Sequence, residues 1–140
     1  MRSPRIGRAL TTIVSVVGLA ACATAEPPST PGSPCATVVV ARLYFGMQYS
    51  KGTVGEGEWR AFVERSVTPR FPDGLTIYEA AGQWRDAQGR IVREPSRVIE
   101  IMHPDGPAPR ESIAAIAAAY KREYGQESVL VVRQRADACF

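Results

Sequence analysis

The sequence predicts an α+β sandwich, in which a four-stranded antiparallel sheet carries two helices on one face. Four stretches are rich in β-branched and aromatic residues, which is typical of strands. Two other stretches repeat apolar residues at the spacing of an amphipathic helix. Their order along the chain is β-α-β-β-α-β, and this order indicates one particular sandwich topology.

The first strand is predicted over residues 36–45, which are apolar on both faces, as expected of a central strand. A glycine-rich loop runs from Gly46 to Gly57. A helix is predicted from Glu56, because apolar residues recur there at helical spacing. Pro69 ends this helix.

The middle of the chain is predicted to form a β-hairpin. Its strands are residues 75–85 and 91–102, joined by a turn over residues 86–89 with glycine where the backbone needs a positive φ. Pro95 has no amide hydrogen to give to a neighbouring strand. We therefore expect a bulge or a sheet-edge segment at Pro95.

A second helix is predicted over residues 109–124, with Pro109 in its first turn and Gly125 as its C-terminal stop. The final strand is predicted over residues 128–135. The complete order is that of a ferredoxin-like sandwich, in which the last strand lies antiparallel beside the first.

The cysteines support this topology independently. Cys35 precedes the first strand and Cys139 follows the last, so antiparallel pairing of those strands brings the two thiols together. There is no Cys-x-x-Cys motif, and a single histidine cannot complete a zinc site. We therefore predict a structural disulfide between Cys35 and Cys139, and no metal or cofactor.

The sheet face without helices is predicted to be unusually apolar. We expect the helix side to carry Thr37, Val39, Leu43, Phe45, Ile99, Ile101, Leu130 and Val132. We expect the open side to carry Val38, Val40, Arg42, Tyr44, Val98, Glu100, Met102, Val129, Val131 and Arg133. This open side is too apolar for bulk water, so a second copy of the chain, a C-terminal segment or a ligand should cover it.

The N-terminus has the features of an export signal. Residues 1–8 carry three arginines, and residues 9–21 form an apolar run too short for a stable membrane span. The run ends Leu19-Ala20-Ala21-Cys22, which looks like a bacterial lipobox with an acylated cysteine. Ordinary signal-peptidase cleavage at Ala23-Thr24-Ala25 is the alternative. Lipidation of Cys22 would hold an exported domain on the cell membrane or the outer membrane.

These features divide the chain into three parts. A signal peptide covers residues 1–21, and residues 22–34 form a tether with four prolines among small polar residues. The single folded domain is residues 35–140. Without residues 1–21 the chain has fourteen basic and fourteen acidic residues. Binding to nucleic acid needs a cationic surplus, so we expect no nucleic-acid partner.

Several motifs resemble one protein family. They are Leu43-Tyr44-Phe45-Gly46, Glu58-Trp59, residues 68–74, residues 82–86, Arg93-Glu94-Pro95-Ser96, Tyr120-Lys121 and residues 126–130. Together these stretches resemble an uncharacterised bacterial family of exported proteins, the domain of unknown function 3574 family. The resemblance covers nearly all of residues 36–140. It implies the extent of the domain and a bacterial envelope setting, and it brings no activity or catalytic residue.

Four side chains are candidates for chemistry. His103 is predicted in a turn, either exposed to solvent or acting as a general base beside Glu100, Tyr44 or Tyr78. Arg42 and Glu100 fall on neighbouring strands of the open face. We expect them to form an ion pair, which is either structural or the floor of a ligand cavity.

The hairpin is dense in arginine. Arg85 and Arg93 are candidates for anion binding, because guanidinium groups bind carboxylates and phosphates. Cross-strand ion pairs with Asp86 and Glu94 are the simpler explanation. Trp84 either packs within the domain or stacks on a ligand.

Three interpretations of the function remain. The first is a lipid-anchored envelope protein whose domain binds a small molecule or an envelope protein without catalysis. The second is a small cofactor-free enzyme, a homodimer that stacks two open sheet faces into an α/β barrel around Tyr44, Arg42 and Glu100, with His103 as a further candidate. A purely structural envelope component is a third interpretation.

Overall fold

The computed structural model describes residues 35–139. The predicted signal peptide, the tether and Cys22 lie outside the described residues. The elements are β1 (Cys35–Gly46), β2 (Gln48–Tyr49), β3 (Gly52–Thr53), α1 (Glu56–Phe62), the π-helix η1 (Val63–Val67), β4 (Thr76–Arg85), β5 (Ile91–His103), α2 (Pro107–Tyr124) and β6 (Leu130–Cys139).

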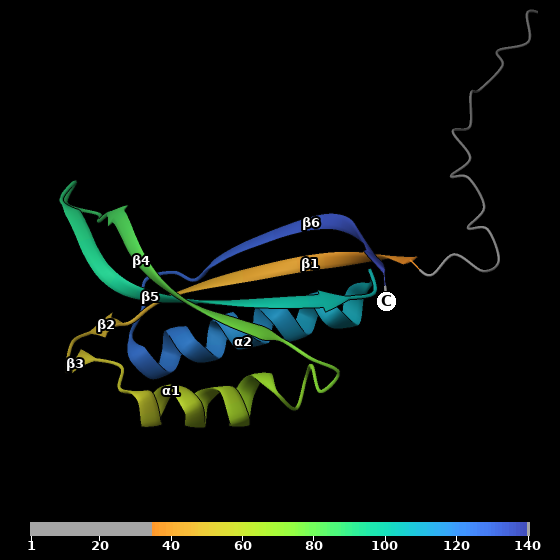
Figure 1. The fold of residues 1–140 in the computed structure, drawn as a ribbon. Coiled ribbons are helices and arrows are strands. Elements are labelled where there is room, and N and C mark those ends of the chain that lie inside the picture. The colour runs from red at the N-terminus through yellow and green to blue at the C-terminus, as the bar shows by residue number, and fades with distance from the viewer. Residues whose placement is uncertain (1–34, 140) are drawn as a thin grey trace, which may run out of the picture. The chain divides into compact units, whose positions relative to one another are not determined.

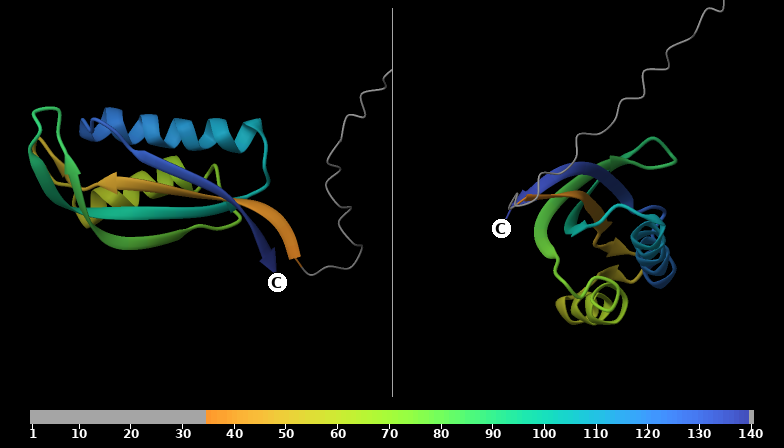
Figure 2. Two further views of the ribbon diagram at one scale, coloured as in Figure 1. Left: turned by 90° about the horizontal axis from the view of Figure 1, so that it is seen from above. Right: turned by 90° about the vertical axis from the view of Figure 1, so that its right-hand side faces the viewer.

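The main sheet has the strand order β4-β5-β1-β6, and every neighbouring pair is antiparallel. The helices α1 and α2 cover one face of this sheet and leave the other face open (Figure 1, Figure 2). The first and last strands lie side by side, as the topology requires. The predicted ferredoxin-like sandwich is therefore confirmed.

The core lies between the sheet and the helices. The ring of Phe45 on β1 meets those of Trp59, Phe62 and Tyr120 edge to face, at centroid distances of 5.3, 6.1 and 4.7 Å. The buried hydroxyl of Tyr120 donates a hydrogen bond of 2.7 Å to the backbone oxygen of Gly46. Without this partner, the buried hydroxyl would reduce the stability of the fold. The bond also connects α2 to the end of β1. Burial also raises the pKa of Tyr120 well above its ordinary value.

β1 and β5 present the predicted faces. Directly opposite residues share a face of a sheet. Leu43 lies opposite Ile99 and both are fully buried on the helix side, whereas Arg42 lies opposite Glu100 on the open side.

β6 presents the reverse of the predicted faces. Val131 lies opposite Leu43 and packs on the core, whereas Leu130 is 59% exposed on the open face. The prediction was wrong for Val131 and Arg133, which lie on the helix side, and for Leu130 and Val132, which lie on the open side. It was also wrong for Val129, which directly precedes β6 and packs against the core. A shift of one residue in the pairing register exchanges the two faces of a strand. Both faces of this segment are apolar, so the sequence pattern does not distinguish one register from the other.

Other details also differ from the prediction. β6 continues to Cys139, because edge strands tolerate the polar residues that end it. α2 begins at Pro107, whose missing amide hydrogen needs no partner in a first turn. The glycine-rich loop contains the short hairpin β2–β3.

The β4–β5 hairpin extends beyond the rest of the sheet. Residues 96–103 of β5 pair with β1, whereas residues 91–95 pair only with β4. Figure 1 shows this end of the hairpin curving away from the helices. Pro95 lies where β5 becomes an edge strand, and its carbonyl accepts a hydrogen bond of 3.0 Å from the backbone nitrogen of Met47. The predicted sheet-edge segment at Pro95 is confirmed.

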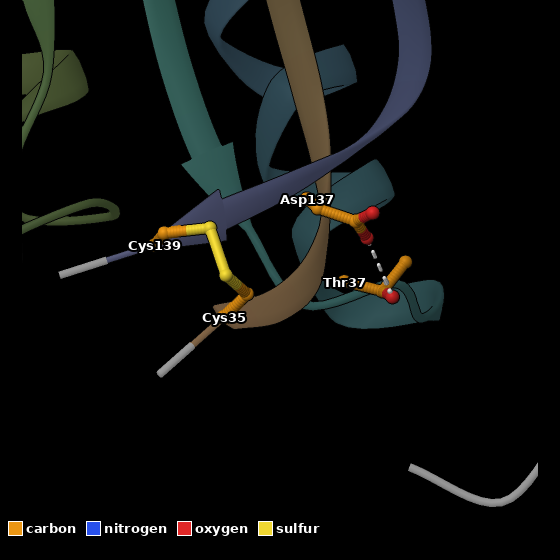
Figure 3. Close-up of a disulfide and its surroundings, with 4 residues drawn as sticks. All are labelled: Cys35, Thr37, Asp137 and Cys139. Carbon is orange, nitrogen blue, oxygen red and sulfur yellow. Dashed lines mark hydrogen bonds between the residues drawn. A yellow bond between two sulfur atoms is a disulfide. The ribbon is translucent and has the colours of Figure 1, made fainter. Parts of the chain in front are cut away.

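The ends of the domain are joined covalently. Cys35 and Cys139 lie directly opposite each other on β1 and β6 and form the predicted disulfide (Figure 3). Beside the bridge, the hydroxyl of Thr37 donates to the carboxylate of Asp137 at 3.1 Å. The disulfide closes a loop with a sequence separation of 104 residues.

Candidate functional site

A pocket of about 290 Å³ opens on the sheet face that the helices leave free. We name it the hairpin pocket. It is bounded by the extended part of the β4–β5 hairpin, by the end of β1 and by residues 126–130 after α2. The pocket forms here because β1 ends at Gly46 while the hairpin continues and curves (Figure 1). The side-chain amide of Gln126 donates a hydrogen bond to the backbone oxygen of Gln48. This bond holds the segment of residues 126–130 at the edge of the pocket.

Three large apolar side chains line the pocket and remain accessible. Tyr44 on β1 is 36% exposed, Trp84 on β4 is 37% exposed, and Leu130 on β6 lies opposite Tyr44 in the sheet. Such exposed aromatic surface in a concavity is typical of ligand sites.

A carboxylate is fixed at the hairpin side of the pocket. Trp84 Nε1 donates to Oε1 of Glu94 at 2.7 Å, and the backbone nitrogen of Gln48 donates to Oε2 at 3.1 Å. Both donors are neutral. Each oxygen can accept a further hydrogen bond, so the group can still bind a ligand.

Two glycines make room for these polar groups. A Cβ atom at Gly46 would lie 2.6 Å from Oε1 of Glu94, and one at Gly82 would lie 2.4 Å from the hydroxyl oxygen of Ser96. Real Cβ atoms do not approach so closely. The absence of side chains at these two positions therefore lets Glu94 and Ser96 lie across the open face.

The predicted ion pair between Arg42 and Glu100 is confirmed. Arg42 Nε donates to Oε2 of Glu100 at 2.5 Å, and the hydroxyl of Tyr78 donates to Oε1 at 3.2 Å. The Glu100 side chain is only 12% exposed, so its charge needs this compensation. These residues lie on the open face outside the hairpin pocket. Of Arg42, Tyr44, Glu100 and His103, only Tyr44 lines it.

His103 does not join the other candidates. Its position opposite Val39 places it on the helix side of the sheet, whereas Tyr44 and Glu100 are on the open side. It is 4% exposed and its Nδ1 donates to the carbonyl of Pro104 at 2.7 Å, so the prediction of a solvent-exposed turn histidine was wrong. β5 runs through residue 103, and the strand buries the side chain before the turn begins.

The hairpin arginines are placed differently from the simpler prediction. Glu94 accepts a hydrogen bond from Trp84, and Asp86 pairs with Arg90. The expected cross-strand ion pairs of Arg85 and Arg93 are absent among the described residues. Neither guanidinium has an ion pair within residues 35–139. Anion binding by Arg85 and Arg93 stays a prediction.

Two carboxylates with a lowered pKa lie away from the pocket. A hydrogen bond from Arg97 lowers the pKa of Glu56, and one from Arg110 lowers the pKa of Asp105. Both carboxylates sit in ordinary surface ion pairs. In the described part of the chain no group of three His, Cys, Asp or Glu side chains could hold a metal ion. No helix within residues 35–139 is long and apolar enough to cross a membrane.

Sequence reasoning missed the central polar residue of the pocket. Glu94 was expected to pair with arginine, and Trp84 was undecided. The available signal was the spacing of Gly82, Trp84 and Glu94 around the hairpin, since glycine within a strand often marks a close approach.

The fold is shared with solved structures. A phage SAM lyase in complex with S-methyl-5′-thioadenosine has a TM-score of 0.55 at 16% identity, covering 82% of this chain and 97% of that one. The apo state of a phage SAM lyase has a TM-score of 0.53 at 18% identity, covering 74% and 90%. CutA from Synechococcus elongatus has a TM-score of 0.49 at 12% identity, covering 74% and 80%. At these identities the likeness shows the fold alone.

Comparison of the sequence with curated proteins and with family models gives two results. No curated protein matches the chain. A family model described as a protein of unknown function, DUF3574, matches residues 40–140, which is nearly the whole folded domain. The chain therefore belongs to the DUF3574 family, as its motifs implied.

Proposed function

We propose that this protein is an exported, lipid-anchored envelope protein whose domain binds a small molecule in the hairpin pocket without catalysis. The anchoring part of the proposal rests on the apolar run of residues 9–21 and the lipobox ending at Cys22. A lipid anchor followed by a proline-rich tether would hold the domain near a membrane and leave its open face accessible.

The observation that supports binding is the pocket itself. It combines accessible aromatic walls with a polar group that is already held in place, and small-molecule sites share both properties. Glu94 is oriented by two donors of the protein itself, the indole of Trp84 and the backbone of Gln48. A group oriented in advance loses little conformational entropy when a ligand binds.

The pocket can be tested by filling it. Ala80 lines it on the exposed strand β4, so Ala80→Phe should place a ring in the cavity with little effect on folding. Thr76→Phe is the matched control, because Thr76 lies on the same strand and face but outside the pocket. Native mass spectrometry of the protein from an oxidising periplasm should show a co-purified small molecule in the wild type and in Thr76→Phe. Ala80→Phe should lose it.

Two results would contradict small-molecule binding in the hairpin pocket. If both phenylalanine variants retain the adduct, the ligand binds elsewhere. If the wild type carries no adduct and instead captures an envelope protein, the open face serves a protein partner.

A second candidate is the cofactor-free enzyme. The network of Arg42, Glu100 and Tyr78 next to the pocket favours it, because a fixed guanidinium and a phenol are groups that orient polar substrates. As such an enzyme, the protein would be a dimeric α/β barrel in which two copies cover each other's open sheet faces. S-methyl-5′-thioadenosine, the ligand of the similar phage enzyme, is one compound to include in a screen. Turnover that is lost in Arg42→Ala or Tyr44→Phe, by a dimer, would favour this candidate over simple binding.

A further inference from the structure

We propose that the hairpin pocket takes a small organic ammonium ion, that is, a protonated amine on an aromatic or other apolar body. This inference rests on the binding function proposed above and specifies the chemistry of its ligand.

The first argument is the charge of the pocket. Its charged lining residues are Glu94 and Glu127, and no Arg, Lys or His from residues 35–139 lines it. Glu94 is half-buried, and within the described residues it accepts hydrogen bonds only from neutral donors. Glu100 is also half-buried, but Arg42 compensates its charge. The charge on Glu94 is therefore left for a ligand to compensate.

The second argument is the aromatic wall. The bond from Trp84 Nε1 to Oε1 holds the indole next to the carboxylate, and Tyr44 lines the same cavity. Because Trp84 turns its N–H edge to Glu94, the carboxylate can bind the ammonium group, and the aromatic surfaces of Trp84 and Tyr44 are left to pack against the apolar body of the ligand. The same charges repel carboxylates and phosphates.

The third argument selects an organic cation over a metal ion. Calcium takes six to eight oxygen ligands, and magnesium needs a near-ideal octahedron. Among the described residues no group of three acidic, histidine or cysteine side chains is placed so that it could hold a metal ion. The apolar walls instead suit a carbon skeleton. A cavity of about 290 Å³ sets its size at the small end of ligand sites.

The test uses three probes with one ring and different charges: phenethylamine, which is protonated at pH 7, 2-phenylethanol and phenylacetate. The readout is the NMR resonance of the Trp84 indole N–H in the full chain, assigned with Trp84→Phe. Trp59 is buried in the core, so its indole resonance is an internal control. We expect phenethylamine to shift the Trp84 resonance at a concentration about tenfold lower than 2-phenylethanol needs. Phenylacetate should not shift it.

Variants identify the charge that is responsible. Glu94→Gln should weaken phenethylamine about tenfold and leave 2-phenylethanol unchanged. Glu127→Gln is the second variant. Glu127 is exposed at the pocket, so its charge is better screened by water, and the substitution should weaken phenethylamine by a smaller factor. Glu64→Gln is the control, because Glu64 is exposed on η1 outside the pocket.

The outcomes separate the two proposals. Equal affinity for phenethylamine and 2-phenylethanol, or tighter binding of phenylacetate, overturns the ammonium inference and leaves the pocket as a binding site. Unchanged phenethylamine affinity in both glutamine variants overturns it as well. If no probe shifts the Trp84 resonance, both the ammonium inference and the hairpin pocket as a binding site are wrong.

Discussion

The carboxylate of Glu94 lies directly over Gly46, so close that a Cβ atom at residue 46 would stand 2.6 Å from Oε1 and 2.7 Å from Oε2. Gly46 is also the last residue of β1, where the hairpin begins to extend beyond the sheet. One small residue thus sets both the position of the carboxylate and the floor of the pocket.

Gly46→Ala should displace the Glu94 carboxylate and break its bonds to Trp84 Nε1 and to the backbone nitrogen of Gln48. Losing these hydrogen bonds should reduce the free energy of unfolding by about 1–2 kcal/mol, as measured by urea denaturation. In Gly46→Ala/Glu94→Ala no carboxylate remains to be displaced. The double variant should therefore be more stable than the sum of the two single effects predicts.

Gly57→Ala is the control for this cycle. Nothing lies within 4 Å of a Cβ at Gly57, which is in α1. Alanine there should leave stability unchanged or raise it by up to about 1 kcal/mol, because it favours helix. Additive effects of the Gly46 and Glu94 substitutions would show that the two residues do not contact in solution.

The sequence predicted the fold because several independent signals agree. Apolar periodicity indicated the elements, and the cysteines at the two ends required the first and last strands to pair. The faces of β1 were predictable because Arg42 and Tyr44 alternate with buried residues. The faces of β6 were not, because Leu130 and Val131 are equally apolar and only the pairing register distinguishes them.

The site was predictable only in part. The pairing of Arg42 with Glu100 follows from their places on adjacent strands of one face. The contact of Glu94 with Trp84 is diagonal across a hairpin, and it depends on how far that hairpin curves. Curvature is a property of the whole sheet, which a local pattern does not reveal.

Arg42→Met should destabilise the domain by about 1–3 kcal/mol, because it leaves the Glu100 carboxylate, which is largely buried, with only the Tyr78 hydroxyl. Arg42→Met/Glu100→Leu should recover most of this loss, since no charge then remains uncompensated. Arg93→Met should change stability by less than about 0.5 kcal/mol, because Arg93 is exposed. Equal losses in the single and double variants at residues 42 and 100 would contradict this account.

Cys35→Ser/Cys139→Ser should lower the free energy of unfolding by about 2–5 kcal/mol, because the disulfide closes almost the whole domain into a loop and restricts the unfolded chain. The midpoint of thermal unfolding should fall by at least about 10 °C. Dithiothreitol should lower the midpoint of the wild type in the same way and have no effect on the serine variant. A wild-type midpoint that does not respond to the reductant under unfolding conditions would mean that the bridge is absent in solution.

Asp86 should make the stability of the hairpin turn depend on pH. Its Oδ1 accepts hydrogen bonds of 2.9 Å from the backbone nitrogens of Arg90 and Gln88, and its Oδ2 accepts one of 2.8 Å from Arg90 Nε. These bonds, led by the backbone N–H of Arg90, lower the pKa of Asp86 below its ordinary value of 3.8. The stabilisation is therefore complete above about pH 4 and is lost as the pH falls through the lower pKa of the folded state.

In Asp86→Asn the titrating group is absent. The difference in unfolding free energy between the wild type and this variant should be largest at neutral pH and should shrink below about pH 4, as measured by urea denaturation at each pH. Gln88→Ala keeps the carboxylate in the same turn, so its difference from the wild type should stay constant across this range. A wild-type advantage over Asp86→Asn that persisted at pH 2 would show that the hydrogen bonds act without the charge, and that the carboxylate is not the source of the pH dependence.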